Sequence, residues 1–308
     1  MSFERFVWLL RREWMQHHRG WILLALIPIG LVLVLVPFSA IDFDGTPVPE
    51  APMLGLLAAS ACIYGVMALV AATVVFQAAG MARRDQQDRS IEFWLSLPTG
   101  HWQSVLANVL MHVVLMPLMA LLIAFVGAQL VAAAVVAKVS GFGALGDLLQ
   151  PAWFSYHAMV LLRQVIGVGV AALWMSPVVL AAMAAASWLK GWGVPALVAS
   201  TVVVGIVVKQ ATGHAVVSDT LTHWFTETLA ALMPLARGEA EVKAAIRGGS
   251  GLDGFAAWMW ADIGVMLRDL AVPAFAAALV VAGIGFALVV LRRAGGLSAR
   301  LPWAPRAA

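Results

Sequence analysis

Six long apolar runs, separated by polar or proline-rich segments, constrain this 308-residue chain more than any other feature. A helix crosses the core of a bilayer with about 20 apolar residues. By that rule the chain contains six membrane-spanning helices, at residues 21–38, 53–80, 105–137, 159–188, 194–208 and 270–291. Charged residues make up only 11% of the chain, whereas soluble domains contain about 25%. We therefore predict an all-α integral membrane protein.

The distribution of basic residues predicts how the spans are oriented. If both termini lie on one side of the membrane, that side holds 12 of the 19 Lys and Arg residues but only five of the 16 Asp and Glu residues. Short loops rich in Lys and Arg stay in the cytoplasm. We therefore expect a multi-pass membrane protein with cytoplasmic N- and C-termini. The basic pI then follows from orientation and does not indicate nucleic-acid binding.

Residues 1–20 read as an amphipathic helix at the cytoplasmic interface, with its arginines toward anionic lipid. Its apolar face carries Phe3, Val7, Leu10 and Trp14, and the opposite face carries Arg5, Arg12 and Gln16. The simpler alternative is a basic anchor that only sets the topology.

A second segment outside the spans, residues 209–269, contains two amphipathic stretches around the sequence GGSGLDG. We expect these stretches to lie on or dip into the outer leaflet. They are too small to form a soluble domain with a core of its own. The whole chain, residues 1–308, is therefore one transmembrane domain.

The most polar stretch is RRDQQDRSIEFWLSLP, residues 83–98, within the predicted cytoplasmic loop 81–104. Its second half is compatible with a short helix, which Pro98 ends. Exposed aromatic and aliphatic side chains on such a helix need a covering surface. Either the membrane domain or a second protein provides that cover. The alternative is an ordinary connection whose arginines only fix the topology.

At these residues the chain resembles the ABC-2 type permeases, the membrane subunits of one group of ABC exporters. Those permeases carry Arg, several residues, Glu and then Leu-Ser-Leu-Pro between their second and third spans. Arg89, Glu92 and residues 95–98 match that pattern here. In the family this stretch forms the coupling helix, which docks on the ATPase subunit. Phe93 and Trp94 stand where the family often has smaller aliphatic residues.

The resemblance also covers the layout of the whole chain. Residues 1–20 match the family's N-terminal elbow helix, the six spans match its count, and residues 209–269 match its outer helices before the last span. It implies a permease subunit of a bacterial inner membrane that forms the translocation path and works with a second copy or a related permease in the lipid bilayer. It also implies coupling to two copies of a cytoplasmic ATPase. The residues implied in coupling are Arg84, Arg89, Glu92, Phe93, Trp94 and Leu95.

ATP and Mg²⁺ are expected on the partner subunit, and no cofactor on this chain. A phosphate-binding loop needs Gly-Lys followed by Ser or Thr, but the four lysines are followed by Val, Gly, Gln and Ala. The metalloprotease motif His-Glu-x-x-His and the hydrolase motif Gly-x-Ser-x-Gly are absent from the sequence. The single cysteine, Cys62, excludes an intrachain disulfide. We therefore predict neither an enzyme nor a metal site.

Polar side chains inside spans are costly in hydrocarbon, so they are candidates for a transport path. We assign four of them to the substrate path: Tyr64, Gln77, Asn108 and His112. Others of the same kind are Thr73, Gln129, Arg163 and Gln164. Each also has a structural explanation, such as a hydrogen bond to a neighbouring helix or, for Arg163, contact with the outer headgroups.

Two other classes of function stay open. An ATP-independent secondary transporter or channel would favour charged residues deep inside the spans, of which the sequence has few. An intramembrane enzyme is disfavoured by the missing motifs. The apolar spans fit a hydrophobic, lipid-like or peptide cargo.

Overall fold

A computed structural model describes residues 3–41, 48–82, 100–233 and 251–295 of the chain. Within these ranges every regular element is helical and no strand occurs, which confirms the predicted all-α class. The main helices are α1 (Phe3–Leu35), α2 (Ala51–Met81), α5 (His101–Leu110), α6 (Met116–Ser140), α7 (Pro151–Leu189), α8 (Gly193–Thr212), α9 (Val216–Leu232), α11 (Gly251–Arg268) and α12 (Pro273–Arg293).

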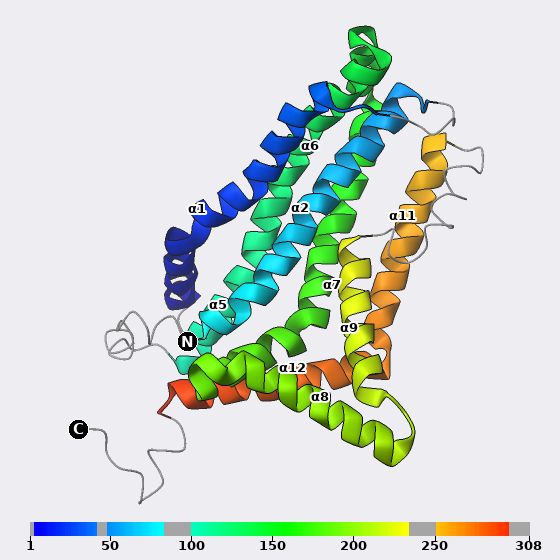
Figure 1. Cartoon of the computed structure of the whole chain (residues 1–308). Helices are drawn as coiled ribbons and strands as arrows, with labels where there is room; N and C mark the ends of the chain where they lie inside the picture. Colours follow the sequence, from blue (N-terminus) through cyan, green and yellow to red (C-terminus); the bar gives the residue numbers. More distant parts are fainter. Residues whose placement is uncertain (1–2, 42–47, 83–99, 234–250, 296–308) are drawn as a thin grey trace, which may run out of the picture.

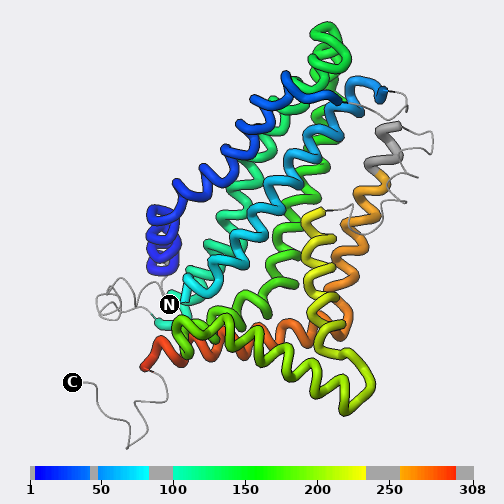
Figure 2. Tube along the Cα trace, in the orientation of Figure 1, coloured from blue at the N-terminus to red at the C-terminus, as the bar shows by residue number. Residues whose placement is uncertain are grey.

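Four long segments form the body of the molecule. Figures 1 and 2 show α1, α2, the α5–α6 run and the first part of α7 side by side, with successive segments running in opposite directions. α6 packs against α1 and α2, and α2 also packs against α7. The start of α1, the end of α2, the start of α5 and the end of α12 lie toward the same lower end (Figure 1). Which side of a membrane that end faces stays a prediction.

Five helical runs of the described residues are long and apolar enough to cross a membrane: Glu4–Phe38, Ala51–Met81, His101–Ser140, Pro151–Thr212 and Pro273–Arg293. The chain is therefore a multi-pass membrane protein by the length and composition of its helices. The predicted fourth and fifth spans fall in a single run, Pro151–Thr212, and the count of six spans stays a prediction.

A turn at Lys190 divides that run into α7 and α8. Lys190 has a φ of 54°, and the direction of the chain reverses there. Figures 1 and 2 show α8 and α12 running across the lower end of the body instead of along it. α12 packs mainly against α7. In α8 many valines are exposed, among them Val198, Val202 and Val204.

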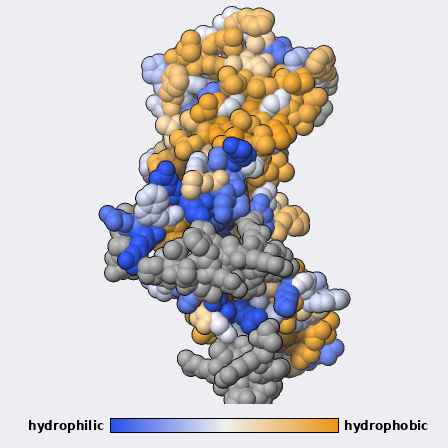
Figure 3. Space-filling model, turned by 90° about the vertical axis from the view of Figure 1, so that its left-hand side faces the viewer, coloured by the Kyte–Doolittle hydropathy of each residue, from blue (hydrophilic) through white to orange (hydrophobic). Residues whose placement is uncertain are grey.

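Apolar side chains cover much of the outer surface. Figure 3 shows the face that carries α1, where a broad apolar belt gives way below to hydrophilic residues. Such an apolar exterior is costly in water and is matched by the hydrocarbon of a bilayer.

Residues 3–20 are helical, as predicted, but they continue without a break into the first span within α1. Figure 1 shows a change of direction along this helix. The face buried against the protein carries Leu9 and Glu13, whereas Val7 and Trp14 are exposed. The predicted orientation of Arg12 toward lipid is wrong, because its side chain is largely buried and pairs with Glu13. Packing of α1 on α5 decides which face is covered.

The third long run is interrupted by a π-helical segment, η2 (Met111–Leu115), between α5 and α6. Pro117 is the second residue of α6, which begins immediately after η2. Proline has no N–H to donate to the carbonyl four residues earlier, here that of Val113, and its ring crowds that carbonyl. The ladder of i→i−4 hydrogen bonds is therefore disturbed at η2, which changes the direction in which His112 projects.

The predicted outer segment 209–269 contains α9 and α11, and both pack against α7. α8 ends at Thr212 and is followed by Gly213, whose φ of 75° suits glycine, and α9 then turns back toward the body. Figure 1 shows the connection between α8 and α9 at the lower end of the molecule, the end toward which the start of α1 also lies. The side of the membrane assigned to residues 209–269 therefore stays a prediction.

Candidate functional site

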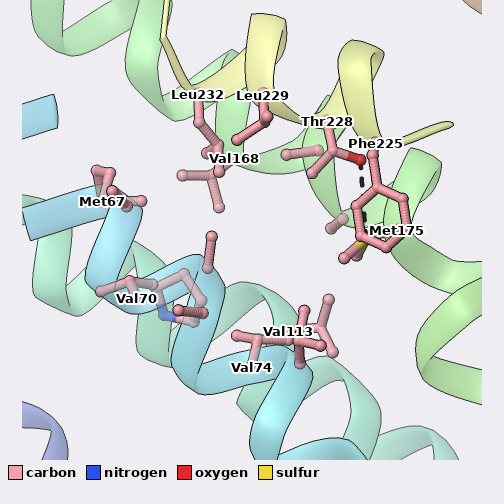
Figure 4. Close-up of a pocket in the computed structure, with 17 residues that line it drawn as sticks. Met67, Val70, Val74, Val113, Val168, Met175, Phe225, Thr228, Leu229 and Leu232 are labelled. Carbon is pink, nitrogen blue, oxygen red and sulfur yellow. Dashed lines mark hydrogen bonds between the residues drawn. The ribbon is translucent and has the colours of Figure 1, made fainter. Parts of the chain in front are cut away.

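An apolar cavity of about 270 Å³ lies between α2, α7 and α9, beside η2 and the start of α6. Figure 4 shows its walls, with Met67, Val70 and Val74 from α2 opposite Leu229 and Leu232 from α9. The cavity exists because the side chains of α2 and α7 that face α9 are mostly small or branched, and they are too short to fill the space between these helices. None of the described lining residues is charged.

The cavity reaches the surface of the molecule beside α9. Two of its lining residues there, Phe225 and Leu229, are 41% and 45% exposed. The hydroxyl of Thr228 also lines it but donates to the carbonyl of Trp224 at 2.8 Å. The cavity therefore offers a ligand apolar contact and a side entrance, with little capacity for hydrogen bonding.

A buried polar cluster joins α7, α9 and α11 next to this cavity. The guanidinium of Arg163 is 0% exposed and donates to the carboxylate of Asp262 and to the backbone carbonyls of Ala230 and Ala231. The side chain of Gln164 donates to the carbonyl of Leu232 at 2.9 Å. Together Arg163 and Gln164 satisfy the carbonyls at the C-terminal end of α9, which would otherwise be unpaired in an apolar setting.

The alternative that Arg163 reaches the outer headgroups is therefore wrong. Its side chain is 0% exposed and donates four hydrogen bonds inside the protein, to the carboxylate of Asp262 and to two backbone carbonyls. Its partner Asp262 lies in residues 209–269, which were expected at the outer membrane surface, so the pairing with Arg163 was not predicted. Arg163 and Gln164 hold α9 against α7 and thereby support one wall of the cavity.

A second polar cluster joins α1 to η2. Glu13 is buried and pairs with Arg12 through one carboxylate oxygen, Oε1. Its other oxygen, Oε2, lies 3.8 Å from Nε2 of His17 and 3.7 Å from Nε2 of His112. The rings of His17 and His112 are 4.8 Å apart between centroids, and Trp21 packs nearby.

A polar cavity of about 260 Å³ adjoins this cluster between α1 and α2. It is lined by Gln16, His17, Gly20, Trp21, Leu24, Thr73 and Gln77. Of the residues predicted for the substrate path, Gln77 lines this cavity together with His17, and His112 lies against the ring of His17. The partners Glu13 and His17 were missed, although their spacing of four residues on one helix was a usable signal.

The other two residues assigned to the substrate path lie elsewhere. Tyr64 hydrogen-bonds to Ser60 within α2 and lies within electrostatic reach of Arg163 and Asp262. Asn108 donates to the carbonyl of Met81 at 3.3 Å and lines a small pocket at the lower end that also contains Arg293. The four residues therefore do not form one site, and none of them lines the apolar cavity.

The six residues implied in coupling to an ATPase lie outside the described residues: Arg84, Arg89, Glu92, Phe93, Trp94 and Leu95. The structure does place the helix ends that flank them. α2 ends at Met81 and α5 begins at His101, and the hydrogen bond from Asn108 joins these two helices. Comparisons of the chain with protein-family models, with curated proteins and with solved structures each found no match.

Proposed function

We propose that this chain is a permease subunit of an ATP-driven exporter that moves an apolar substrate and depends on a separate ATPase. The observation that carries the proposal is the apolar cavity between α2, α7 and α9. Transfer of apolar surface from water into such a site is favourable by about 25 cal/mol per Å². A lipid-like or otherwise hydrophobic molecule is the class of substrate that these walls suit.

The side entrance supports the same class of substrate. Phe225 and Leu229 form part of an apolar exterior that suits contact with lipid. A hydrophobic molecule dissolved in the bilayer reaches the cavity there without passing through water. Polar groups are few in the cavity, so shape and volume decide which substrates fit.

The position of the proposed coupling segment supports a link between ATP use and this cavity. Residues 83–98 connect the end of α2 to the start of α5. α2 forms one wall of the cavity, and the run that begins with α5 contributes Val113 and Pro117. A displacement of the segment by an ATPase would therefore move two elements that line the cavity. The proposed arrangement has two ATPase copies and a second permease, with both termini in the cytoplasm.

The second candidate function is an ATP-independent secondary transporter or channel. Buried charges favour it, because Arg163, Asp262 and Glu13 are all buried within helices. Such groups in a membrane often belong to ion or proton pathways. In this chain the guanidinium of Arg163 is engaged by Asp262 and by the end of α9, an arrangement that suits a structural tie.

Inside-out vesicles from the native host, with and without overproduction of the chain, distinguish the two candidates. The vesicles are offered a panel of lipophilic fluorescent dyes and labelled phospholipids, with ATP or ADP. We expect uptake that requires ATP and increases with the amount of the chain. Val168→Phe fills the cavity and should abolish uptake, whereas Val165→Phe, on the exposed side of the same helix, should not. Equal uptake with ADP supports the second candidate.

A further inference from the structure

Glu13, His17 and His112 bring three potential metal ligands together where α1 meets η2. Glu13 and His17 lie one turn apart on α1, so their side chains share a face of the helix. His112 approaches from η2. One oxygen of Glu13 and one nitrogen of each histidine all lie within 4.8 Å of one another.

The buried state of His112 points to a ligand. Its side chain is 1% exposed, and neither ring nitrogen has a hydrogen-bond partner among the described residues. The distance of 3.7 Å from Nε2 to the Glu13 carboxylate is longer than a hydrogen bond. A buried polar group without a partner costs about 1–3 kcal/mol. His112 lies in a π-helical segment. Such segments are rare in proteins overall, but where they occur they are often at functional sites.

We propose that Glu13, His17 and His112 bind one divalent transition-metal ion of the zinc class. Two imidazoles and a carboxylate form a ligand set that suits Zn²⁺ and leaves a fourth position open. Around Zn²⁺ the ligand atoms would lie about 3.3 Å apart, given bonds of about 2.0 Å and tetrahedral angles. The ligand atoms, which lie up to 4.8 Å apart, would therefore have to move closer together to bind the ion. The sequence alone had indicated no metal site.

The surroundings supply the other features that a metal site needs. Arg12 holds Oε1 of Glu13, so Oε2 stays directed toward both histidines. Such a supporting contact orients a ligand. His17 also lines the polar cavity of about 260 Å³, where Gln77 and Thr73 face the same space. This cavity gives the ion an entry path and room for water at the fourth position. A bound ion ties α1 to the run that contains α5 and α6.

Metal binding is tested on the full chain, purified in mild detergent through a tag without histidine and treated with a chelator. Zn²⁺ is added, the sample is desalted, and the retained metal is measured by elemental mass spectrometry. Co²⁺ in place of Zn²⁺ reports four-coordinate geometry through its visible absorption. We expect one ion per chain, and a higher melting temperature with Zn²⁺ than without it.

Glu13→Gln and His112→Gln should weaken binding by at least the roughly 10- to 100-fold typical when a supporting residue of a metal site is lost. His17→Ala provides a variant that is less exposed to misfolding, because His17 is only partly buried. The matched control is His18→Ala, since His18 stacks on Trp14 outside the cluster. The proposal is overturned if the wild-type chain retains no stoichiometric metal, or if His17→Ala binds Zn²⁺ as the control does.

Discussion

Arg163 of α7 and Asp262 of α11 form a buried ion pair between residues 99 positions apart in the sequence. Nε and Nη2 of the guanidinium lie 2.9 Å and 2.7 Å from the same oxygen, Oδ2. Nη1 and Nη2 also donate to the carbonyls of Ala231 and Ala230 at the end of α9. One side chain thus fixes two helices of residues 209–269 to the body of the molecule.

We expect Asp262→Leu to lower the free energy of unfolding by about 3–5 kcal/mol, because it leaves the Arg163 charge buried without its counter-charge. The measurement is a denaturant titration of the purified protein followed by circular dichroism. Asp219→Asn, at an exposed position of α9, is the control and should change little. The double variant Arg163→Met with Asp262→Leu should recover part of the loss, and a double variant no more stable than Asp262→Leu contradicts this explanation.

Gly167 permits the close approach of α7 to α9. A Cβ atom at this position would lie 2.2 Å from the carbonyl oxygen of Ala231. Gly167→Ala therefore has to push α9 away, and we expect it to destabilise the protein by about 1–3 kcal/mol. Gly169, two residues along, has open space around it.

Gly169→Ala is accordingly a matched control, expected to be neutral or to stabilise by about 0.4–1 kcal/mol. Thermal unfolding of the two variants in the same detergent gives the comparison. If both variants have the same melting temperature, the packing of α9 on α7 in solution is looser than the structure has it.

Lys138, near the end of α6, donates to the carbonyls of Val36, Pro37 and Ser39 at the end of the first span. Lys138→Met removes these charge-assisted bonds and should cost about 1.5 kcal/mol of unfolding free energy. Lys209→Met, at the exposed end of α8, provides the comparison in the same denaturant titration. An equal effect of the two substitutions shows that Lys138 contributes nothing to joining α1 and α6.

Hydropathy alone predicted where most helices lie. The predicted span 53–80 corresponds to α2, and 194–208 lies within α8. The direction of each helix was not predictable in this way, because the course of α8 and α12 across the lower end depends on their packing against α7. The length and apolarity of a helix are properties of that helix alone, and they contain no information about its contacts with other helices.

The polar clusters were only half predictable. His112 and Gln77 stood out as polar residues in apolar runs, and so did Arg163. Their partners did not, because Glu13 lies in a segment rich in charge and Asp262 lies in a segment assigned to the membrane surface. A lone Asp in the apolar sequence FAAWMWADIGVML was the available signal for the ion pair. Pairing over 99 residues depends on the tertiary fold.

In the proposed function, this chain docks a separate ATPase through residues 83–98. The most direct test is to purify the tagged chain gently from its native membrane and to identify co-purifying soluble proteins by mass spectrometry, for the wild type, for Trp94→Asp and for Trp192→Asp. Trp192 is an exposed residue of the turn before α8 and serves as the matched control. We predict a stoichiometric ATPase with the wild type and with Trp192→Asp, lost in Trp94→Asp. A wild-type chain that purifies without any ATPase and transports in ATP-free liposomes contradicts the claim.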